Sequence, residues 1–160
     1  MAILSATFKT LLALDNDVFT DLRNRRPHIV ALVEDYRRNH KLLPPLTAMT
    51  VFQARFGFDK EIARLGALDE RFEESRVRME QAIKDCGVLE INDRAAAIAS
   101  HIFARLSASE RNKHWADVFI AATALAHDHG VVTRNRTDFE LIGQHLPSFA
   151  EDLHLAIWKS

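Results

Sequence analysis

The sequence predicts a parallel α/β sheet of four to five short strands, covered by helices on both faces. Short apolar runs alternate with longer helical patterns along the 160 residues. Strands buried on both faces read as continuous apolar runs, and the crossovers between parallel strands are usually helices. A hydrophobic content of 48% at this length is typical of one ordinary domain. We therefore expect a single domain over residues 1–160.

The first strand is expected at Lys9–Leu14, an apolar run that ends abruptly at Asp15. Apolar residues at helical spacing predict a helix from Val18. Pro27 then opens a second, amphipathic helix that runs to His40, since a proline at the first helical position loses no hydrogen bond.

The middle of the chain predicts a helical arm. Two adjacent prolines exclude a central strand before Leu46 but allow a short strand there. A helix is predicted over residues 48–56, and Gly57 is expected to loosen or kink it before a further helical stretch at 59–68. The highly charged segment 69–84 predicts a solvated helix in the same arm.

The second half returns to alternating strands and helices. In chain order we expect a strand at 88–91, a helix at 94–106 capped by Asn92 or Asp93, a polar break at 107–114, a helix from Trp115 that Gly130 ends, a strand at 131–133, a short helix at 138–143 and an edge strand at 153–158.

Composition excludes several classes of protein. There are 21 Lys and Arg residues against 22 Asp and Glu, so no global positive field draws the chain to nucleic acid. The single Cys86 excludes an internal disulfide framework and suits a reducing compartment. No apolar run approaches the roughly 20 residues that span a bilayer, and residues 1–10 lack a secretory leader. We expect a cytoplasmic protein without membrane attachment.

The candidate chemistry lies in three acids far apart in the sequence: Asp15, Asp117 and Asp138. In a parallel sheet, ligands bind beyond the carboxyl ends of the strands, and two of these acids follow predicted strands. Asp117 is expected in the first turn of its helix, where the macrodipole favours negative charge. Carboxylates that converge repel one another unless a cation lies among them. Oxygen ligands without a cysteine or histidine cluster indicate Mg²⁺ or Mn²⁺, which can activate water against a phosphodiester.

Each acid also has a purely structural explanation. Asp15 can cap the helix that begins near Val18, Asp117 can satisfy a helix N-terminus, and Asp138 can cap the short helix after it. Taken singly, each acid is explained by capping, and only joint placement favours a metal site. If all three are caps, their carboxylates will be dispersed and no ion will bind among them.

Three segments resemble PIN-domain ribonucleases, and in particular the VapC-type toxins of bacterial toxin–antitoxin pairs. LLALDNDVFTDLR (11–23) is similar to the family's opening strand, acid and helix. TVFQARFG (50–57) is similar to its segment with a Glu four residues before a Gly, and WADVFIAATALAHDHGVVTRNRTDF (115–139) to its closing block. The closing block is the most specific of the three.

The resemblance implies a PIN-like fold with metal-binding, catalytic acids at Asp15, Asp117 and Asp138. It also implies that Thr133 and Asn135 lie beside the site, where their side chains would orient a carboxylate or a water.

The family's remaining acid falls on Gln53. An amide oxygen can still touch a metal ion or its waters, but one negative charge is lost, so weaker metal binding is expected. Asp17 stands where the family more often has Asn, and it is a candidate compensating carboxylate two residues from Asp15.

The resemblance further implies an endoribonuclease that hydrolyses RNA with Mg²⁺ or Mn²⁺, acting as the toxin of a toxin–antitoxin pair. Arg134, Arg136 and Arg23 are candidate RNA contacts around the acidic centre. A homodimer and a small antitoxin are implied as partners, and the apolar faces of 29–36 and 56–68 either line a groove for the antitoxin or serve the core.

One alternative from a different class stays open. Gln53 favours a catalytically weakened PIN domain that acts as an RNA-binding or protein-interaction module. Metal-dependent cleavage that is lost on Asp15→Asn indicates the enzyme, whereas RNA binding without cleavage indicates the module.

Overall fold

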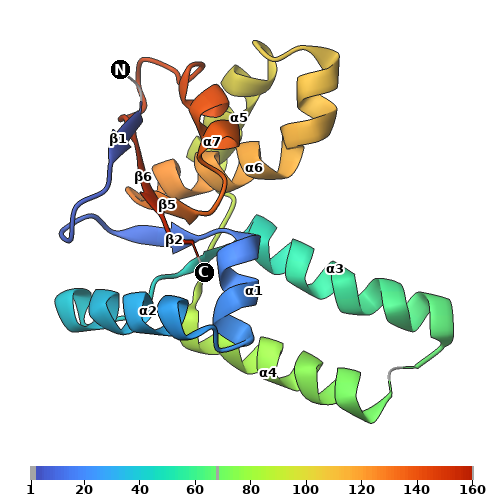
Figure 1. Ribbon diagram of the computed structural model, residues 1–160. Coiled ribbons are helices and arrows are strands. Elements are labelled where there is room, and N and C mark those ends of the chain that lie inside the picture. Colours follow the sequence, from blue (N-terminus) through green and yellow to red (C-terminus); the bar gives the residue numbers. More distant parts are fainter. Residues whose placement is uncertain (1–2, 68, 160) are drawn as a thin grey trace.

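A computed structural model describes residues 3–67 and 69–159. That part of the chain contains a six-stranded sheet with the order β1-β6-β5-β2-β3-β4, in which every pairing is parallel (Figure 1). The strands are β1 (Ile3–Ser5), β2 (Leu12–Leu14), β3 (Leu46–Thr47), β4 (Val88–Leu89), β5 (Gly130–Thr133) and β6 (Leu153–Ile157). The predicted parallel α/β class is confirmed, with one strand more than the expected maximum of five.

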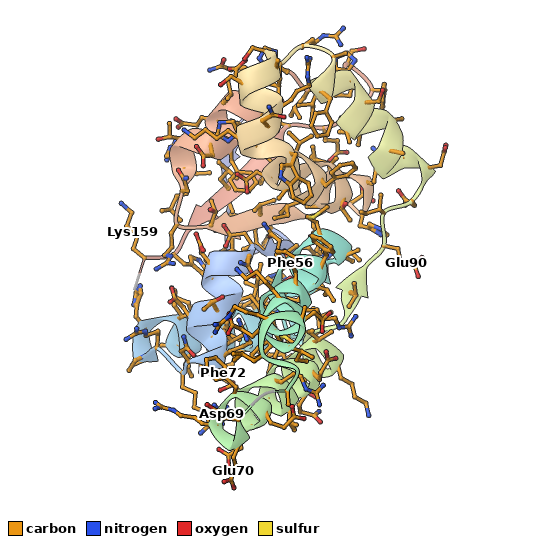
Figure 2. The ribbon with its side chains drawn as sticks, turned by 90° about the vertical axis from the view of Figure 1, so that its right-hand side faces the viewer. Phe56, Asp69, Glu70, Phe72, Glu90 and Lys159 are labelled. Carbon is orange, nitrogen blue, oxygen red and sulfur yellow. The ribbon has the colours of Figure 1, made fainter. Side chains whose placement is uncertain are left out.

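Helices cover both faces of this sheet. They are α1 (Asn16–Arg23), α2 (Pro27–His40), α3 (Ala48–Leu65), α4 (Glu70–Cys86), α5 (Asp93–Phe103), α6 (Ala108–Ala126) and α7 (Arg136–Gly143). One buried apolar cluster joins the sheet mainly to α5, α6 and α7, and a second joins it to α1, α2, α3 and α4. Figure 2 shows the two groups of helices on opposite sides of the molecule.

The central strand β2 packs against both helical layers. Leu12 and Leu14 belong to the cluster with α1–α4, whereas Ala13 belongs to the cluster with α5–α7. A strand buried on both faces needs apolar side chains at every position, which explains the uninterrupted run. The chain leaves β2 toward β3 and leaves β5 toward β6, so the strand order reverses between β2 and β5, where α/β sheets usually place ligands.

The predicted helical arm is confirmed. Helices α3 and α4 extend side by side beyond the sheet (Figure 1), and Asp69 and Glu70 mark the turn at their tip (Figure 2). Arg55 on α3 donates hydrogen bonds of 3.0 and 2.9 Å to the carboxylate of Glu80 on α4. This exposed pair fixes the register of the two helices at one point.

Gly57 does not interrupt the arm, because α3 runs continuously past it to Leu65. Gly66 ends the helix in a left-handed conformation with φ of 81°. The predicted end at Leu68 lies outside the described residues. Among the described residues, no helix combines the length and apolar content that a membrane crossing requires.

The N-terminal edge of the sheet differs from the prediction. Only Leu12–Leu14 of the run Lys9–Leu14 forms a strand, because a turn precedes it. In that turn the Thr10 N–H donates to the Thr7 carbonyl, and the Thr7 N–H donates to the Thr10 hydroxyl, both at 3.0 Å. The unpredicted β1 lies before the turn and pairs with β6. Strand β6 is therefore internal, and its prediction as an edge strand was wrong.

The predicted polar break at 107–114 was also wrong, since α6 begins at Ala108. The Ser107 hydroxyl accepts from the Glu110 N–H at 3.1 Å, and the Glu110 carboxylate accepts from the Ser107 N–H at 2.8 Å, which forms a capping box. Asp117 consequently lies in the third turn of the helix and not in the first. The helix macrodipole does not explain an acid at that position.

Gly130 is the first residue of β5 and does not end α6, contrary to the prediction. The helix ends at Ala126, and Asp128 adopts the left-handed conformation that follows it, with φ of 59°. A Cβ atom at Gly130 would lie 2.5 Å from the carbonyl oxygen of His154. The glycine is needed because β6 approaches β5 so closely at this point.

Candidate metal centre

Strands β2 and β5 place Asp15 at the reversal point of the sheet. The Asp15 N–H donates to the Val132 carbonyl at 3.0 Å, which extends the pairing of the two strands by one residue. The side chain of Asp15 is buried and accepts from the Val18 N–H at 3.0 Å, so it caps α1 as expected. Its carboxylate also receives a hydrogen bond from the Thr133 side chain at the end of β5.

Helix α6 supplies two polar side chains one turn apart, His114 and Asp117. Residues three apart lie on the same face of a helix, and the cap at Ser107 sets the register of this face. His114 is buried at 5% exposure, although its Nδ1 atom has no hydrogen-bond partner in the part of the chain that the structure describes. The Asp117 side chain is 28% exposed.

Helix α7 supplies Asp138 in its first turn. Asn135 caps this helix, because its side-chain oxygen accepts from the Asp138 N–H at 3.4 Å. The Asn135 amide nitrogen donates to the Asp138 carboxylate in return. The cap is thus Asn135 and not Asp138, so the carboxylate of Asp138 is left to face the neighbouring helix.

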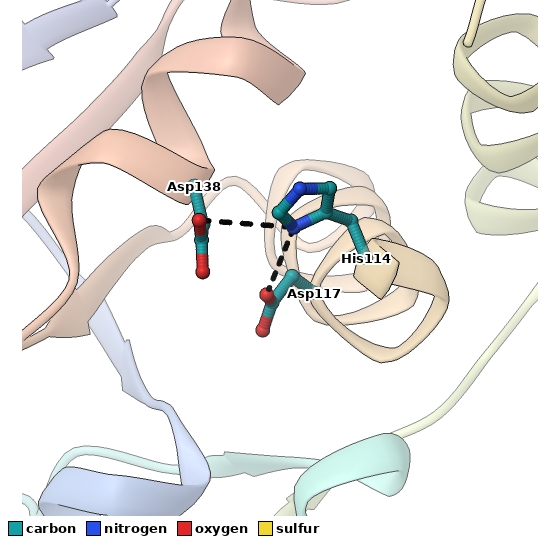
Figure 3. Close-up of side chains that lie close together, drawn as sticks. All are labelled: His114, Asp117 and Asp138. Atoms are coloured by element: carbon teal, nitrogen blue, oxygen red, sulfur yellow. Dashed lines mark ion pairs between the residues drawn. The ribbon is translucent and has the colours of Figure 1, made fainter. Parts of the chain in front are cut away.

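These elements bring His114, Asp117 and Asp138 together (Figure 3). His114 Nδ1 lies 3.9 Å from Asp117 Oδ2 and 3.8 Å from Asp138 Oδ1. One ligand atom from each of the three residues lies within 4.8 Å of the others. Asp117 and Asp138, separated by 21 positions in the chain, are therefore not dispersed caps, and capping explains Asp15 alone.

The charges of neighbouring acids affect the pKa of Asp15. Burial raises the pKa of the Asp15 carboxyl from 3.8 to about 6 against the lowering effect of its hydrogen bonds, and Asp17 and Asp117 raise it further. Burial likewise raises the pKa of Asp117 to about 6, with added repulsion from Asp138 and Asp17. The charge of Asp17 raises the pKa of both carboxyls and that of Asp117 raises the pKa of Asp15, so these acids share one region of negative potential, which a bound cation would relieve.

The residues present fit a divalent cation. Carboxylate oxygens are ligands for Mg²⁺ and Mn²⁺, and a neutral imidazole nitrogen is a ligand for transition metals. The buried Gln53 Oε1 atom is a further acceptor that has no hydrogen-bond partner among the described residues. Gln53 is carried by α3, which packs against α6, where the ring of Phe52 meets the ring of Trp115 at 6.2 Å between centroids.

Asp17 and Arg134 form part of the rim of the site. Asp17 is largely exposed, and its charge contributes to the raised pKa values of Asp15 and Asp117. Arg134 lies 3.9 Å from the Asp17 carboxylate and 3.3 Å from that of the buried Asp21. Arg134 is therefore paired within the chain.

The other arginines considered for RNA contact have partners too. Arg136 donates to Glu140 one turn along α7. Arg23 is partly buried, with its guanidinium 5.2 Å from the centroid of the Phe19 ring and 6.0 Å from that of Phe58. Burial lowers the pKa of Arg23.

Two residues near the site have no counterpart in the sequence predictions, His114 and Asp21. The assumed polar break concealed His114, although the pattern Ser107-x-x-Glu110 is a helix-start signature that would have placed it one turn from Asp117. Asp21 had no comparable signal, because its pairing with Arg134 depends on the packing of α1 against the end of β5.

The two apolar faces at 29–36 and 56–68 have different roles: one is part of the core and the other is exposed. Ile29, Val33 and Tyr36 on α2 are buried in the core. Phe56 and Leu65 on α3 are exposed, so only the second face is available to a partner.

Comparison with known proteins gives one family and a consistent set of folds. The PIN domain model matches residues 13–143. VapBC2 from Rickettsia felis, bound to a DNA fragment from its promoter, is similar at 14% identity and a TM-score of 0.66, over 92% of this chain and 98% of that chain. FitAcB from Neisseria gonorrhoeae is similar at 25% identity and a TM-score of 0.60, over 90% and 95%.

A third similar structure is VapBC-5 from Mycobacterium tuberculosis, a member of the VapBC family of toxin–antitoxin systems. It matches at 21% identity and a TM-score of 0.53, over 92% of this chain and 98% of that chain. No curated protein sequence matches significantly.

Proposed function

The chain belongs to the PIN domain family, and on that premise we propose that it is a metal-dependent endoribonuclease that acts as the toxin of a toxin–antitoxin pair. Residues 1–160 form its single domain. In this proposal the chain is a hydrolase that cleaves RNA phosphodiester bonds, with Mg²⁺ or Mn²⁺ as its cofactor.

One observation carries the proposal. Asp117 and Asp138 converge with His114. Asp15 lies outside this group, at the reversal point of the parallel strands, and the charge of Asp117 raises its pKa. Neither Asp117 nor Asp138 is a helix cap. Asp138 gains from the macrodipole in the first turn of α7, but helix stability does not account for Asp117 in the third turn of α6. When bound, a divalent cation supplies a water of lowered pKa and neutralises charge on a phosphodiester.

The residues of the chain have distinct roles in this proposal. Asp15, Asp117 and Asp138 hold the cation, and Thr133 and Asn135 orient the carboxylates of Asp15 and Asp138 through the hydrogen bonds described above. The buried surroundings of Asp15 limit access of bulk water and strengthen its interaction with a cation.

Gln53 and Asp17 adjust the charge of the site. Gln53 contributes a neutral oxygen in place of a carboxylate, so the affinity for Mg²⁺ is reduced. Asp17 restores part of the negative potential from the rim, because its charge acts on Asp15 and Asp117.

The partners in this proposal are RNA, a small antitoxin and a second copy of the chain. The RNA contacts in this proposal come from Arg134, Arg136 and Arg23. Each guanidinium must give up its partner within the chain before it binds a phosphate, so it binds less readily than an unpaired arginine. The exposed rings of Phe52, Phe56 and Trp115 support a protein interface on α3 and α6. A cytoplasmic location suits all three partners.

The test is an RNA cleavage assay in Mg²⁺ and in Mn²⁺. We expect cleavage by the wild-type chain, background cleavage in EDTA, and background cleavage by Asp117→Asn. Asp152→Asn is the matched control, because Asp152 is an exposed acid before β6. Cleavage that is insensitive to EDTA, or equal in Asp117→Asn and wild type, would contradict the proposal.

A second candidate function is favoured by Gln53 alone. A weakened PIN domain would bind RNA or a protein without hydrolysis. Gel-shift measurements on the same RNA distinguish it: binding without cleavage in either metal supports the module, and cleavage supports the enzyme.

A further inference from the structure

His114 is out of place for a purely structural residue. A buried polar atom is normally hydrogen-bonded, because burial without a partner destabilises the fold by roughly 1–3 kcal/mol. His114 is 5% exposed, yet its Nδ1 atom has no hydrogen-bond partner within residues 3–67 and 69–159. Figure 3 shows that this atom points at the carboxylates of Asp117 and Asp138.

The distances from His114 Nδ1 to the two carboxylates are too long for hydrogen bonds. Nδ1 lies 3.9 Å from Asp117 Oδ2 and 3.8 Å from Asp138 Oδ1, whereas charge-assisted N–H···O bonds measure about 2.7–2.9 Å. Ligand atoms that share one small dication at bonds of about 2.1 Å lie about 3 Å apart when adjacent and about 4.2 Å apart when opposite. The observed separations lie between these two values, so a small movement of the side chains would bring the ligand atoms around one ion.

We infer that His114 is a metal ligand, with Nδ1 as a nitrogen donor beside the carboxylates of Asp117 and Asp138. The inference rests on the proposed metal-dependent function. It adds one ligand to the proposed site and a preference of the site for one metal over another. The ring binds in its neutral form, with its proton on Nε2.

A nitrogen ligand changes which ions the site prefers. Imidazole suits transition metals, whereas Mg²⁺ prefers oxygen and retains its waters. Since Gln53 supplies no charge, a site with one nitrogen donor loses affinity for Mg²⁺ and keeps affinity for Mn²⁺. His114 therefore makes the site selective for Mn²⁺ over Mg²⁺.

The test uses Mn²⁺ itself as the probe, in the 160-residue chain without RNA. Pulsed electron paramagnetic resonance detects a nitrogen nucleus bonded to Mn²⁺. We expect a directly coordinated nitrogen in the wild-type protein, and its replacement by a ¹⁵N signal when histidine alone carries that isotope. This measurement needs no substitution, so it does not depend on a variant that folds.

Variants then assign the nitrogen to one residue. His114→Asn places an amide near the position of Nδ1, and we expect loss of the nitrogen signal with a fall of about tenfold in the ratio of Mn²⁺ to Mg²⁺ affinity, measured by calorimetry. His28→Asn is the matched control, because His28 is exposed on α2, and it should leave both quantities unchanged.

The outcomes separate the two claims. Mn²⁺ bound without a nitrogen signal in the wild type, or an unchanged signal in His114→Asn, overturns the assignment of His114 and leaves the proposed nuclease standing. Absence of Mn²⁺ and Mg²⁺ binding by the wild type overturns both.

Discussion

At the scale of single residues, Asp15 combines a structural role with an electrostatic penalty. Its carboxylate caps α1, and it is buried among other acids. The pKa is raised from 3.8 to about 6, so the folded state holds a proton that the unfolded state releases between these values. As the pH rises through this window, the folded protein loses stability.

Asp15→Asn should therefore stabilise the metal-free protein at high pH. Asparagine caps a helix as well as aspartate and carries no charge, so at pH 8 we expect a gain on the order of 2 kcal/mol in the free energy of unfolding. Below about pH 4 both side chains are neutral and the difference should vanish. Urea unfolding in EDTA at the two pH values measures it, and an equal or lower stability of the variant at pH 8 would refute the buried-charge argument.

A second prediction at this scale concerns Gln53. Gln53→Glu adds a charge at a side-chain oxygen that is buried and has no hydrogen-bond partner among the described residues. We expect the affinity for Mg²⁺ to rise by about tenfold, because a carboxylate replaces a neutral oxygen ligand. Calorimetric titration with Mg²⁺ measures this change, and Gln81→Glu on α4 controls for net charge. No gain in Mg²⁺ affinity would show that Gln53 does not reach the ion. An unchanged Mg²⁺ affinity in Asp17→Asn would show that Asp17 does not contribute to the site.

At the scale of elements, the close contact between β5 and β6 sets the position of the start of β5. A Cβ atom at Gly130 would meet a backbone oxygen at 2.5 Å, whereas one at Gly57 on α3 would meet open space. Gly130→Ala should destabilise the protein by about 1–3 kcal/mol. Gly57→Ala should stabilise it by about 0.5–1 kcal/mol, because alanine favours a helix over glycine. Thermal unfolding of the pair tests this contrast, and equal effects of the two substitutions would contradict it.

The elements also show what the sequence could predict. Strand β2 was recognisable because an apolar run that ends at an acid is a local pattern, and β5 because a short run of β-branched residues follows a helix. Strand β1 was missed, since three residues without alternation acquire strand structure only through pairing with β6. The start of α6 was misplaced although its capping box is local, because the polar composition of 107–114 outweighed a four-residue signature.

At the scale of the whole molecule, the site exists only because distant elements pack together. Asp15, Asp117 and Asp138 could be nominated from the sequence, since each lies near the end of a strand or on a helix that returns to the sheet. The closeness of His114 to Asp138 could not be predicted, because it depends on how α6 and α7 rest against one another. Convergence of side chains between elements is a property of packing.

Metal binding should stabilise the entire fold in a pH-dependent way. A ligand at a hundred times its dissociation constant contributes about 2.7 kcal/mol, which raises the melting temperature of a domain of this size by about 5–10 °C. Asp15 and Asp117 have pKa values of about 6, so protons compete with the metal below that pH. We expect a clear rise with Mn²⁺ at pH 8 and little or none at pH 5, measured by calorimetry. An equal rise at both values would place the ion elsewhere.

The most direct measurement is anomalous X-ray scattering from a crystal of this protein soaked in Mn²⁺. We expect an ion bounded by the carboxylates of Asp15, Asp117 and Asp138. An absence of Mn²⁺ from this position at millimolar concentration, or an ion bound only to acids elsewhere on the surface, would contradict it.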